Sequence, residues 1–234
     1  MTGHAEHRPE LISARDEAPG VRTFRFGAWE GFTFTPGQFL MFHFADEPKI
    51  RRAYSICSAP DASGDYFEVT VGMVGAFSER LGELEPGREG GLVVRGPFGR
   101  WTWGGEGHAV LVSGGTGITP FRAMALLKRG KVTVCACAKT PEGLLFKNEY
   151  DDWRRNGVNV NEKVTQPGAG SYWEGRTGRW AAAEVFAAAN DAAAVYYLCG
   201  PKGMVEDLRE GLQRLGVPPS NIRAEKWGDY TELF

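Results

Sequence analysis

The stretch that decides the fold is Ser113–Pro120, SGGTGITP, which lies between an apolar run and a helix-like run. Residues 108–112 (HAVLV) have the pattern of a buried strand, and residues 121–127 (FRAMALL) have that of a helix. Glycines at such a junction let backbone N–H groups approach an anion at the helix N-terminus. The stretch therefore predicts a strand–turn–helix unit able to hold a pyrophosphate, although a tight connection without a ligand uses the same residues.

The chain that surrounds this turn alternates apolar strands with helices, which is typical of a parallel α/β sheet. The expected strands are 108–112, 131–137, 158–164, 193–199 and 221–227, and the expected helices are 120–128, 144–155, 181–189 and 203–215. Ligands of such a sheet bind beyond the carboxyl ends of its strands. Both Gly114–Gly115 and Cys199–Pro201 fall at carboxyl ends, so both are candidate binding turns.

The N-terminal part of the chain follows a different pattern. Short alternating runs are separated there by Gly, Pro and Asp, which indicates an antiparallel barrel or sandwich. The expected strands are 10–14, 21–25, 39–44, 52–57, 66–71 and 91–95, with one helix over 76–84. A glycine-rich joint at 104–107 separates the two patterns, so we expect one domain over 1–103 and another over 104–234.

Composition excludes several classes of function. The 234 residues carry a net charge of −2, and no Lys/Arg run is longer than a pair, so nucleic-acid binding is not expected. No apolar run approaches the roughly 20 residues of a membrane span, and no signal-peptide pattern opens the chain. Four scattered cysteines make neither a zinc site nor an iron–sulfur motif. We expect a cytoplasmic monomer without a bound metal.

Three motifs in order, Arg52–Ser55 (RAYS), Gly114–Pro120 and Cys199–Pro201 (CGP), give the chain a family resemblance. Over essentially its whole length the chain resembles the ferredoxin-NADP reductase superfamily. The resemblance implies an N-terminal antiparallel Greek-key β-barrel that binds FAD. It also implies a C-terminal parallel-sheet α/β domain that binds NAD(P)H.

In the barrel, the resemblance implies that Arg52 faces the FAD pyrophosphate, that Tyr54 stacks on the flavin and that the Ser55 hydroxyl approaches flavin N5. These residue types suit the roles, since a guanidinium offers paired donors to phosphate and an aromatic ring offers a flat apolar face. The flavin site implied by the resemblance further includes Ala53, Val71, Gly75, Ala76, Phe77 and Ser78.

Two features of this barrel leave alternatives open. The segment Gly75–Ser78 matches a Gly-x-x-Ser motif that receives the second phosphate, but an ordinary N-capping serine has the same pattern. The chain also has Gly72 where many members carry a basic residue, which bears on how tightly flavin is held.

In the second domain, the resemblance places the nicotinamide nucleotide on Gly115, Thr116, Gly117 and Pro120 and on the turn Cys199, Gly200 and Pro201. Glu225–Trp227 matches a Glu-x-aromatic motif near the C-terminus, in which the Trp227 ring shields the flavin. Ser55, Cys199 and Glu225 would then form a small polar set near N5, where a carboxylate can hold or relay a proton. The segment 228–234 extends beyond this motif, and Tyr230 or Phe234 is a candidate to cover the adenine.

The nucleotide preference is not decided by the sequence. Lys139 follows the second strand of the domain, where members that use NADPH often place a cation, and Thr165 stands where many carry serine. The arginine that commonly follows that serine is Gln166 here, and Arg176 or Arg179 is a candidate to replace it. The cofactors expected are therefore FAD and NAD(P)H.

The function that these motifs predict is hydride transfer from NAD(P)H to FAD, followed by release of single electrons to a separate ferredoxin- or flavodoxin-like carrier. One alternative is a flavin reductase that binds flavin loosely as a substrate. A second is a non-catalytic flavin or nucleotide sensor, which would not need Ser55, Cys199 and Glu225 together.

Overall fold

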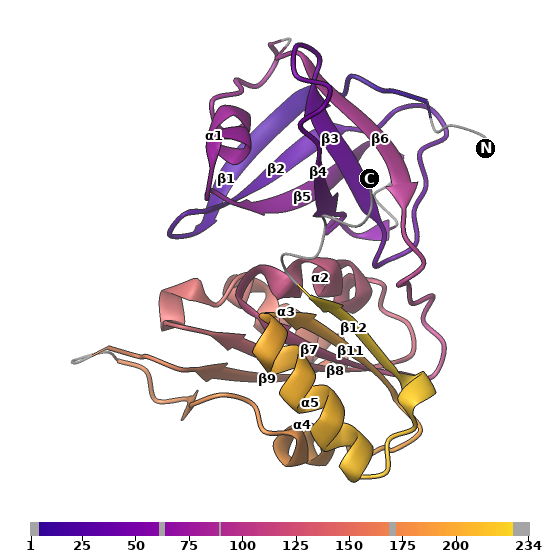
Figure 1. Ribbon diagram of the computed structural model, residues 1–234, viewed down its shortest axis with the longest axis vertical. Helices are drawn as coiled ribbons and strands as arrows, with labels where there is room; N and C mark the ends of the chain where they lie inside the picture. The colour runs from indigo at the N-terminus through magenta and orange to yellow at the C-terminus, as the bar shows by residue number, and fades with distance from the viewer. Residues whose placement is uncertain (1–4, 61–63, 89, 169–171, 227–234) are drawn as a thin grey trace. The chain divides into compact units, whose positions relative to one another are not determined.

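The computed structural model describes residues 5–60, 64–88, 90–168 and 172–226. The chain folds into two compact units (Figure 1). The first consists of residues 1–104 with 119–127, and the second of residues 105–118 with 128–234. Among the described residues, no helix has the length and apolar character needed to cross a membrane.

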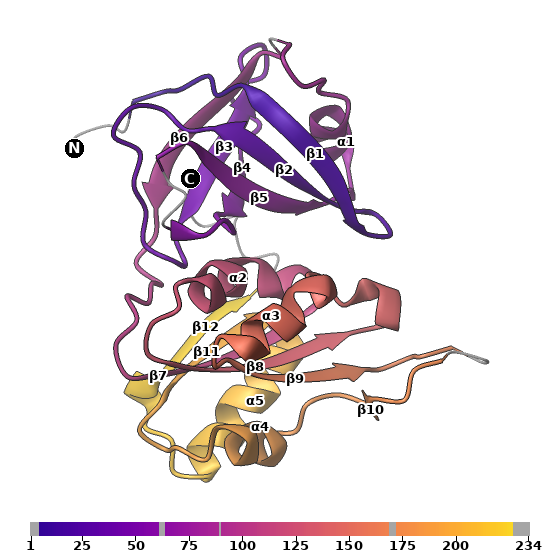
Figure 2. The same ribbon diagram turned by 180° about the vertical axis from the view of Figure 1, so that it is seen from behind.

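The first unit is an antiparallel β-barrel of six strands (Figure 2). The strands are β1 (Leu11–Ala18), β2 (Val21–Gly27), β3 (Phe39–Phe44), β4 (Arg52–Ser55), β5 (Tyr66–Gly72) and β6 (Leu92–Phe98). They form two three-stranded sheets, β1-β2-β5 and β4-β3-β6. Single bridges join the sheets, from Ile56 to Val69 on one side and from His7 to Val94 on the other. The strand order around the barrel is therefore β1-β2-β5-β4-β3-β6, a Greek key, as predicted.

Phenylalanine rings fill the interior of this barrel. Alternate residues of each strand point inward, and Phe24, Phe26, Phe42 and Phe67 are all fully buried. The ring of Phe26 lies 5.5 Å from that of Phe67 and 6.0 Å from that of Phe42. Aromatic packing of this kind contributes large buried areas and fixes ring orientations, so the barrel wall near β3 and β4 is held firmly.

Two helices accompany the barrel strands. Helix α1 (Ala76–Gly82) follows β5, and helix α2 (Thr119–Leu126) groups with the first unit, although it directly follows the glycine-rich turn. The α2 residue Phe121 is fully buried, and its ring lies 5.5 Å from that of Trp101. The sequence-based boundary at 103/104 placed residues 119–127 in the second domain, whereas the structure groups them with the first unit. The reason is that apolar side chains of α2 pack against the barrel.

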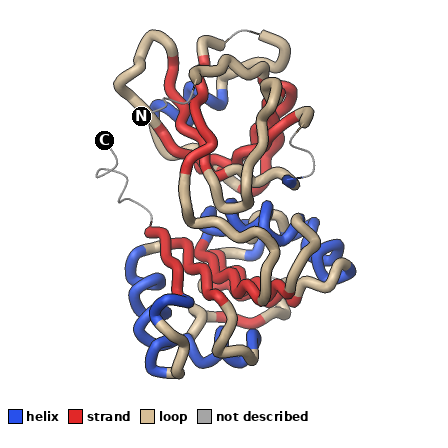
Figure 3. The backbone as a smooth tube through the Cα atoms, turned by 90° about the vertical axis from the view of Figure 1, so that its right-hand side faces the viewer, coloured by secondary structure: helices blue, strands red, loops and turns tan. Residues whose placement is uncertain are grey.

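The second unit contains a parallel six-stranded sheet in the order β10-β9-β8-β7-β11-β12 (Figure 3). Its strands are β7 (His108–Gly114), β8 (Lys131–Ala138), β9 (Asn159–Val164), β10 (Arg176–Thr177), β11 (Val195–Gly200) and β12 (Ile222–Lys226). The parallel sheet is confirmed, and β10 was not expected from the sequence. The strand β10 is two residues long and pairs with the end of β9 at the edge of the sheet.

Helices cover both faces of this sheet. Helices α4 (Ala182–Ala189) and α5 (Lys202–Arg214) lie on one face, where Val112 and Leu198 belong to the same buried cluster as Val185 and Leu208. The opposite face carries α3 (Tyr150–Arg155), as Figures 1 and 2 show. Because successive side chains of a strand alternate, Ser113 and Cys199 point away from α4 and α5.

The predicted helix over 144–155 is wrong in its first half. Short 3₁₀ turns occupy Pro141–Gly143 and Lys147–Glu149, and the helix α3 begins only at Tyr150. Phe146 has a φ of 59°, a left-handed conformation that a continuous α-helix does not contain. The segment buries Leu144, Leu145 and Phe146 side by side, so tertiary packing outweighs their helix propensity.

We predict that Phe42→Ala lowers the free energy of unfolding by about 3–5 kcal/mol, because it opens a cavity among fully buried rings. Ile50→Ala is the matched control, since 41% of that side chain is exposed and its loss should change stability by less than about 0.5 kcal/mol. Urea unfolding curves measure both. Equal effects of the two substitutions would contradict the packing described here.

Candidate functional site

The RAYS motif forms strand β4, whose residues Arg52 and Tyr54 lie on one side because they are two positions apart. The Tyr54 ring lies 5.4 Å from the ring of Phe42 and 6.3 Å from that of Phe77 in α1. The Arg52 guanidinium carbon lies 5.9 Å from the centre of the Phe77 ring. The structure therefore brings Arg52, Tyr54 and Phe77 together, as the sequence predicted for a flavin site.

The chemistry of these side chains suits an aromatic ligand that carries phosphate. Burial raises the pKa of Tyr54 to about 12, so its ring stays neutral at physiological pH. Arg52 is exposed, and its Nη1 donates to the carbonyl oxygen of Arg51 at 2.8 Å. An exposed guanidinium beside a half-buried aromatic ring can bind a phosphate while the ring stacks.

The loop before α1 is shaped by Ser78. Its Oγ accepts hydrogen bonds from the amides of Val74 (3.0 Å) and Gly75 (3.1 Å) and donates to the Gly75 carbonyl (2.8 Å). A Cβ placed on Gly75 would meet nothing within 4 Å, so space is open beside this loop. The hydroxyl of Ser78 folds the loop, and its contact with phosphate stays a prediction.

The other residues predicted for the flavin site have mixed surroundings. The Val71 side chain is buried in the barrel core, as is most of Phe77. Ala53 and Ser55 are half-buried in β4, where Ser55 pairs with Phe39. Trp227, Tyr230 and Phe234 lie outside the described residues.

In the second unit, two turns meet at the carboxyl end of the sheet. Residues Gly115–Ile118 form a 3₁₀ turn after β7, in which Gly115 has a φ of +56°. A Cβ on Gly117 would overlap the carbonyl group of Cys199, and a Cβ on Gly114 would lie 2.9 Å from Cδ of Pro201. Gly117 has no room for a side chain because the two turns approach each other backbone to backbone there, and Gly114 has little room because the Pro201 ring and the Met204 side chain lie against it.

Three polar side chains lie in a row across the strands beneath these turns. Cys199 of β11 pairs with Ser113 of β7 and with Glu225 of β12. In a parallel sheet, paired residues direct their side chains to the same face, so the three share one face at the carboxyl edge. Cys199 and Glu225 were predicted to lie together, and the structure places them on adjacent strands.

Ser113 is a residue that the sequence reasoning missed. It is 1% exposed, and among the described residues its Oγ has no hydrogen-bond partner. Buried hydroxyls without partners are rare and indicate a ligand or water position. Its position in the sequence could have indicated it. Ser113 is a polar residue at the end of the apolar run 108–112, immediately before the glycines.

Glu225 is the titratable group of this row. Burial raises the pKa of the Glu225 carboxyl to about 7. At neutral pH the group is therefore close to half protonated, which lets it both accept and donate a proton.

The remaining residues predicted for the nucleotide site lie at the same edge of the sheet. The Thr165 amide donates to the carbonyl of Ala138 at 3.0 Å, and the Gln166 amide donates to that of Lys139 at 2.7 Å. Lys139 and Thr165 are thus brought together at the ends of β8 and β9, and β10 adds Arg176 beside β9. Pro120 lies in the first turn of α2, immediately after the glycine-rich turn.

Comparison with known proteins agrees with this arrangement. A family model described as an oxidoreductase FAD-binding domain matches residues 9–103, and an oxidoreductase NAD-binding domain model matches residues 111–210. The chain is 32% identical over 236 residues to ferredoxin–NADP reductase B of Sorangium cellulosum (strain So ce56), covering 93% of this chain and 96% of that protein. The chain belongs to the ferredoxin-NADP reductase superfamily. It is an NAD(P)H-dependent flavoprotein oxidoreductase whose cofactors are FAD and NAD(P)H.

Other superfamily members share the sequence pattern or the fold. A probable dihydroorotate dehydrogenase B electron transfer subunit of Methanopyrus kandleri (strain AV19) is 30% identical, over 94% of this chain and 80% of that protein. A crystal structure of a ferredoxin NADP+ reductase from Neisseria gonorrhoeae, 20% identical, superposes with a TM-score of 0.74 over 97% of this chain and 99% of that one. An Amycolatopsis cytochrome P450 reductase, 19% identical, gives 0.78 over 96% and 71%. Both solved structures share the fold of this chain.

We predict that Gly117→Ala destabilises the protein by about 1–3 kcal/mol and weakens nucleotide binding, because the added methyl group collides with the Cys199 carbonyl. Gly203→Ala is the control, since a Cβ there meets nothing within 4 Å. Urea unfolding and NAD(P)H titration measure the two effects. If both variants behaved alike, the close approach of the two turns would be wrong.

Proposed function

We propose that the protein is an electron transferase in which bound FAD takes a hydride from NAD(P)H and gives up electrons singly to a separate ferredoxin- or flavodoxin-like carrier. The observation that carries this proposal is the row Ser113–Cys199–Glu225 at the carboxyl ends of β7, β11 and β12, with a carboxyl group of pKa about 7. Transfer of two electrons from NAD(P)H to one-electron acceptors leaves one proton over. A group that titrates near pH 7 is suited to hold that proton.

Residues of the first unit would hold the flavin cofactor. Tyr54 offers the flat face, Arg52 offers donors to phosphate, and the loop at Gly75 leaves open space. The rings of Phe42 and Phe77 fix the Tyr54 ring from behind. A preorganised ring costs less entropy when a ligand stacks on it.

Residues of the second unit would hold the nicotinamide nucleotide. The backbone of Gly115–Ile118 is close to that of Cys199–Pro201 and presents few side-chain atoms, which leaves backbone groups to meet a pyrophosphate. Lys139, one residue after β8, and Arg176, the first residue of β10, provide positive charge at the same end of the sheet. This charge is compatible with either nucleotide.

The names of the relatives support a separate electron carrier. The Sorangium relative is a ferredoxin–NADP reductase, and the Methanopyrus relative is an electron transfer subunit. Both relatives are aligned over most of their own length, 96% and 80%.

Arg52→Ala should weaken FAD binding by at least about tenfold, because it removes the phosphate donors and leaves the barrel core intact. Arg51→Ala is the matched control one residue away, and it should bind FAD as the wild type does. Titration of FAD-free protein, followed by flavin fluorescence, measures both dissociation constants. Unchanged binding by Arg52→Ala would remove this residue from the phosphate site.

The pH profile of electron delivery should show a group with a pKa of about 7 that belongs to Glu225. The carboxyl is mostly protonated below this pH and mostly ionised above it, so its ability to accept a proton rises as pH increases. Glu225→Gln mimics the protonated form at every pH and should flatten the profile. Glu210→Gln, on the exposed side of α5, is the control. Turnover with a one-electron acceptor that keeps the wild-type profile in Glu225→Gln would refute the proton role.

A further inference from the structure

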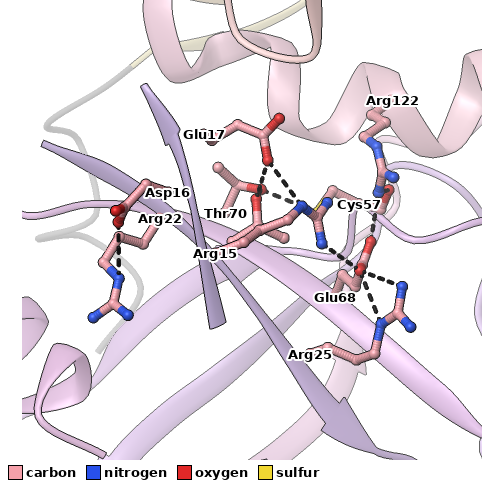
Figure 4. A network of polar contacts seen from close by, with 10 residues as sticks. Arg15, Asp16, Glu17, Arg22, Arg25, Cys57, Glu68, Thr70 and Arg122 are labelled. Atoms are coloured by element: carbon pink, nitrogen blue, oxygen red, sulfur yellow. Dashed lines mark hydrogen bonds and ion pairs between the residues drawn. The ribbon is translucent and has the colours of Figure 1, made fainter. Parts of the chain in front are cut away.

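A buried carboxylate in the barrel collects three arginines (Figure 4). Glu68 of β5 is 1% exposed. Its Oε1 accepts hydrogen bonds from Arg15 (2.8 Å) and from Nε and Nη2 of Arg25 (3.0 and 2.9 Å). Its Oε2 accepts a bond of 2.7 Å from Nη1 of Arg122. Burial opposes ionisation, but the hydrogen bond from Arg15 and the charge of Arg122 outweigh it and lower the pKa of Glu68 to about 2.

The three arginines do not have equivalent positions. Arg15 and Arg25 come from the neighbouring strands β1 and β2, and their side chains are 41% and 37% exposed. Arg122 comes from α2, and its side chain is only 10% exposed. Arg25 and Arg15 already supply two cations to the single charge of Glu68, although Arg15 also pairs with Glu17 at 3.3 Å. The desolvation of a third cation therefore requires another explanation than charge neutralisation, since apolar side chains would pack the helix at lower cost.

The second bond of Arg122 indicates what it does. The same Nη1 donates to the carbonyl oxygen of Cys57 at 2.8 Å. Cys57 comes two residues after Ser55, just beyond the end of β4, the strand that carries the RAYS motif. Arg122 itself comes two residues after Pro120, in the helix that directly follows the glycine-rich turn. The Nη1 atom of Arg122 thus links α2 to Glu68 of β5 and to the backbone just after the RAYS motif.

We propose that Arg122 and Glu68 form a positioning pair, which anchors α2 to the barrel and thereby fixes the nicotinamide-nucleotide turn that α2 continues. Neither side chain is assigned a contact with cofactor or substrate. The effect on turnover rests on the proposed function, because the turn that α2 continues would hold the nicotinamide nucleotide. Small errors in the geometry of a bound reactant change rates strongly, and a displacement of about 1 Å can cost about a hundredfold.

Arg122→Met tests this pair. Methionine keeps an unbranched apolar stem, and Glu68 keeps two arginines, so the barrel should stay folded. We expect the amides of residues 119–127 in FAD-free protein to exchange hydrogen about tenfold faster than in the wild type. In the FAD-loaded protein we expect kcat for flavin reduction to fall about tenfold, while KM for NAD(P)H changes less than about twofold.

Two further variants separate positioning from general loss of structure. Arg25→Met removes bonds to the same carboxylate but none from α2, so helix exchange and kcat should stay at the wild-type level. Arg122→Lys keeps one donor and should restore part of both losses, and it replaces Arg122→Met if that variant does not fold. Wild-type exchange of 119–127 in Arg122→Met would overturn the anchor. Faster exchange with unchanged kcat, or a raised KM alone, would overturn the positioning role.

The exchange measurement uses neither cofactor nor turnover, so it decides the anchor separately from the proposed function. If the wild type itself were not reduced by NADH or NADPH, the proposed function would fail. The comparison of helix exchange among the wild type, Arg122→Met and Arg25→Met would still accept or reject the pair.

Discussion

The site depends on one steric constraint, the backbone approach of the turn at Gly117 to Cys199–Gly200. No side chain fits at Gly117 because the Cys199 carbonyl occupies the place of its Cβ. Glycine at this position lets the turn after β7 reach the end of β11, and the register of β7, β11 and β12 sets Ser113, Cys199 and Glu225 in one row. Burial of this row raises the pKa of Glu225 toward neutrality. Backbone sterics and strand register thus place a carboxyl group of raised pKa at the carboxyl end of the sheet.

Two features order the side chains of the barrel: the packing of its aromatic rings and the buried carboxylate of Glu68. The rings around Phe42 orient Tyr54, while the carboxylate of Glu68 orders arginines from β1, β2 and α2. The first feature shapes a surface for a flat ligand. The second links α2, which follows the turn at Gly115–Ile118, to β5 through Glu68 and to the carbonyl of Cys57. Binding and geometry are therefore served by different parts of the same unit.

Much of this arrangement could be predicted from the sequence because its signals are local. Alternation predicted the barrel strands, and apolar runs with intervening helices predicted the parallel sheet. Short motifs singled out Arg52, Tyr54, Gly117, Cys199 and Glu225, whose roles stay predictions. The misses depend on tertiary contacts. Phe146 combines a left-handed backbone with a buried side chain, which its local sequence does not indicate. Glu68 and Arg122 lie 54 residues apart, so no local pattern points to their contact. The lone hydroxyl of Ser113 became visible only when its buried surroundings were known.

The most direct test of the account is the visible absorption spectrum of the purified protein before and after ultrafiltration, with NAD(P)H then added without oxygen. The account predicts a flavin spectrum that stays with the protein at near-equal stoichiometry and is bleached by NADH or NADPH. A colourless retentate that oxidises NAD(P)H only after free flavin is added would contradict it. In that case flavin would be a substrate that leaves the protein, and the electrons would not pass through a retained cofactor.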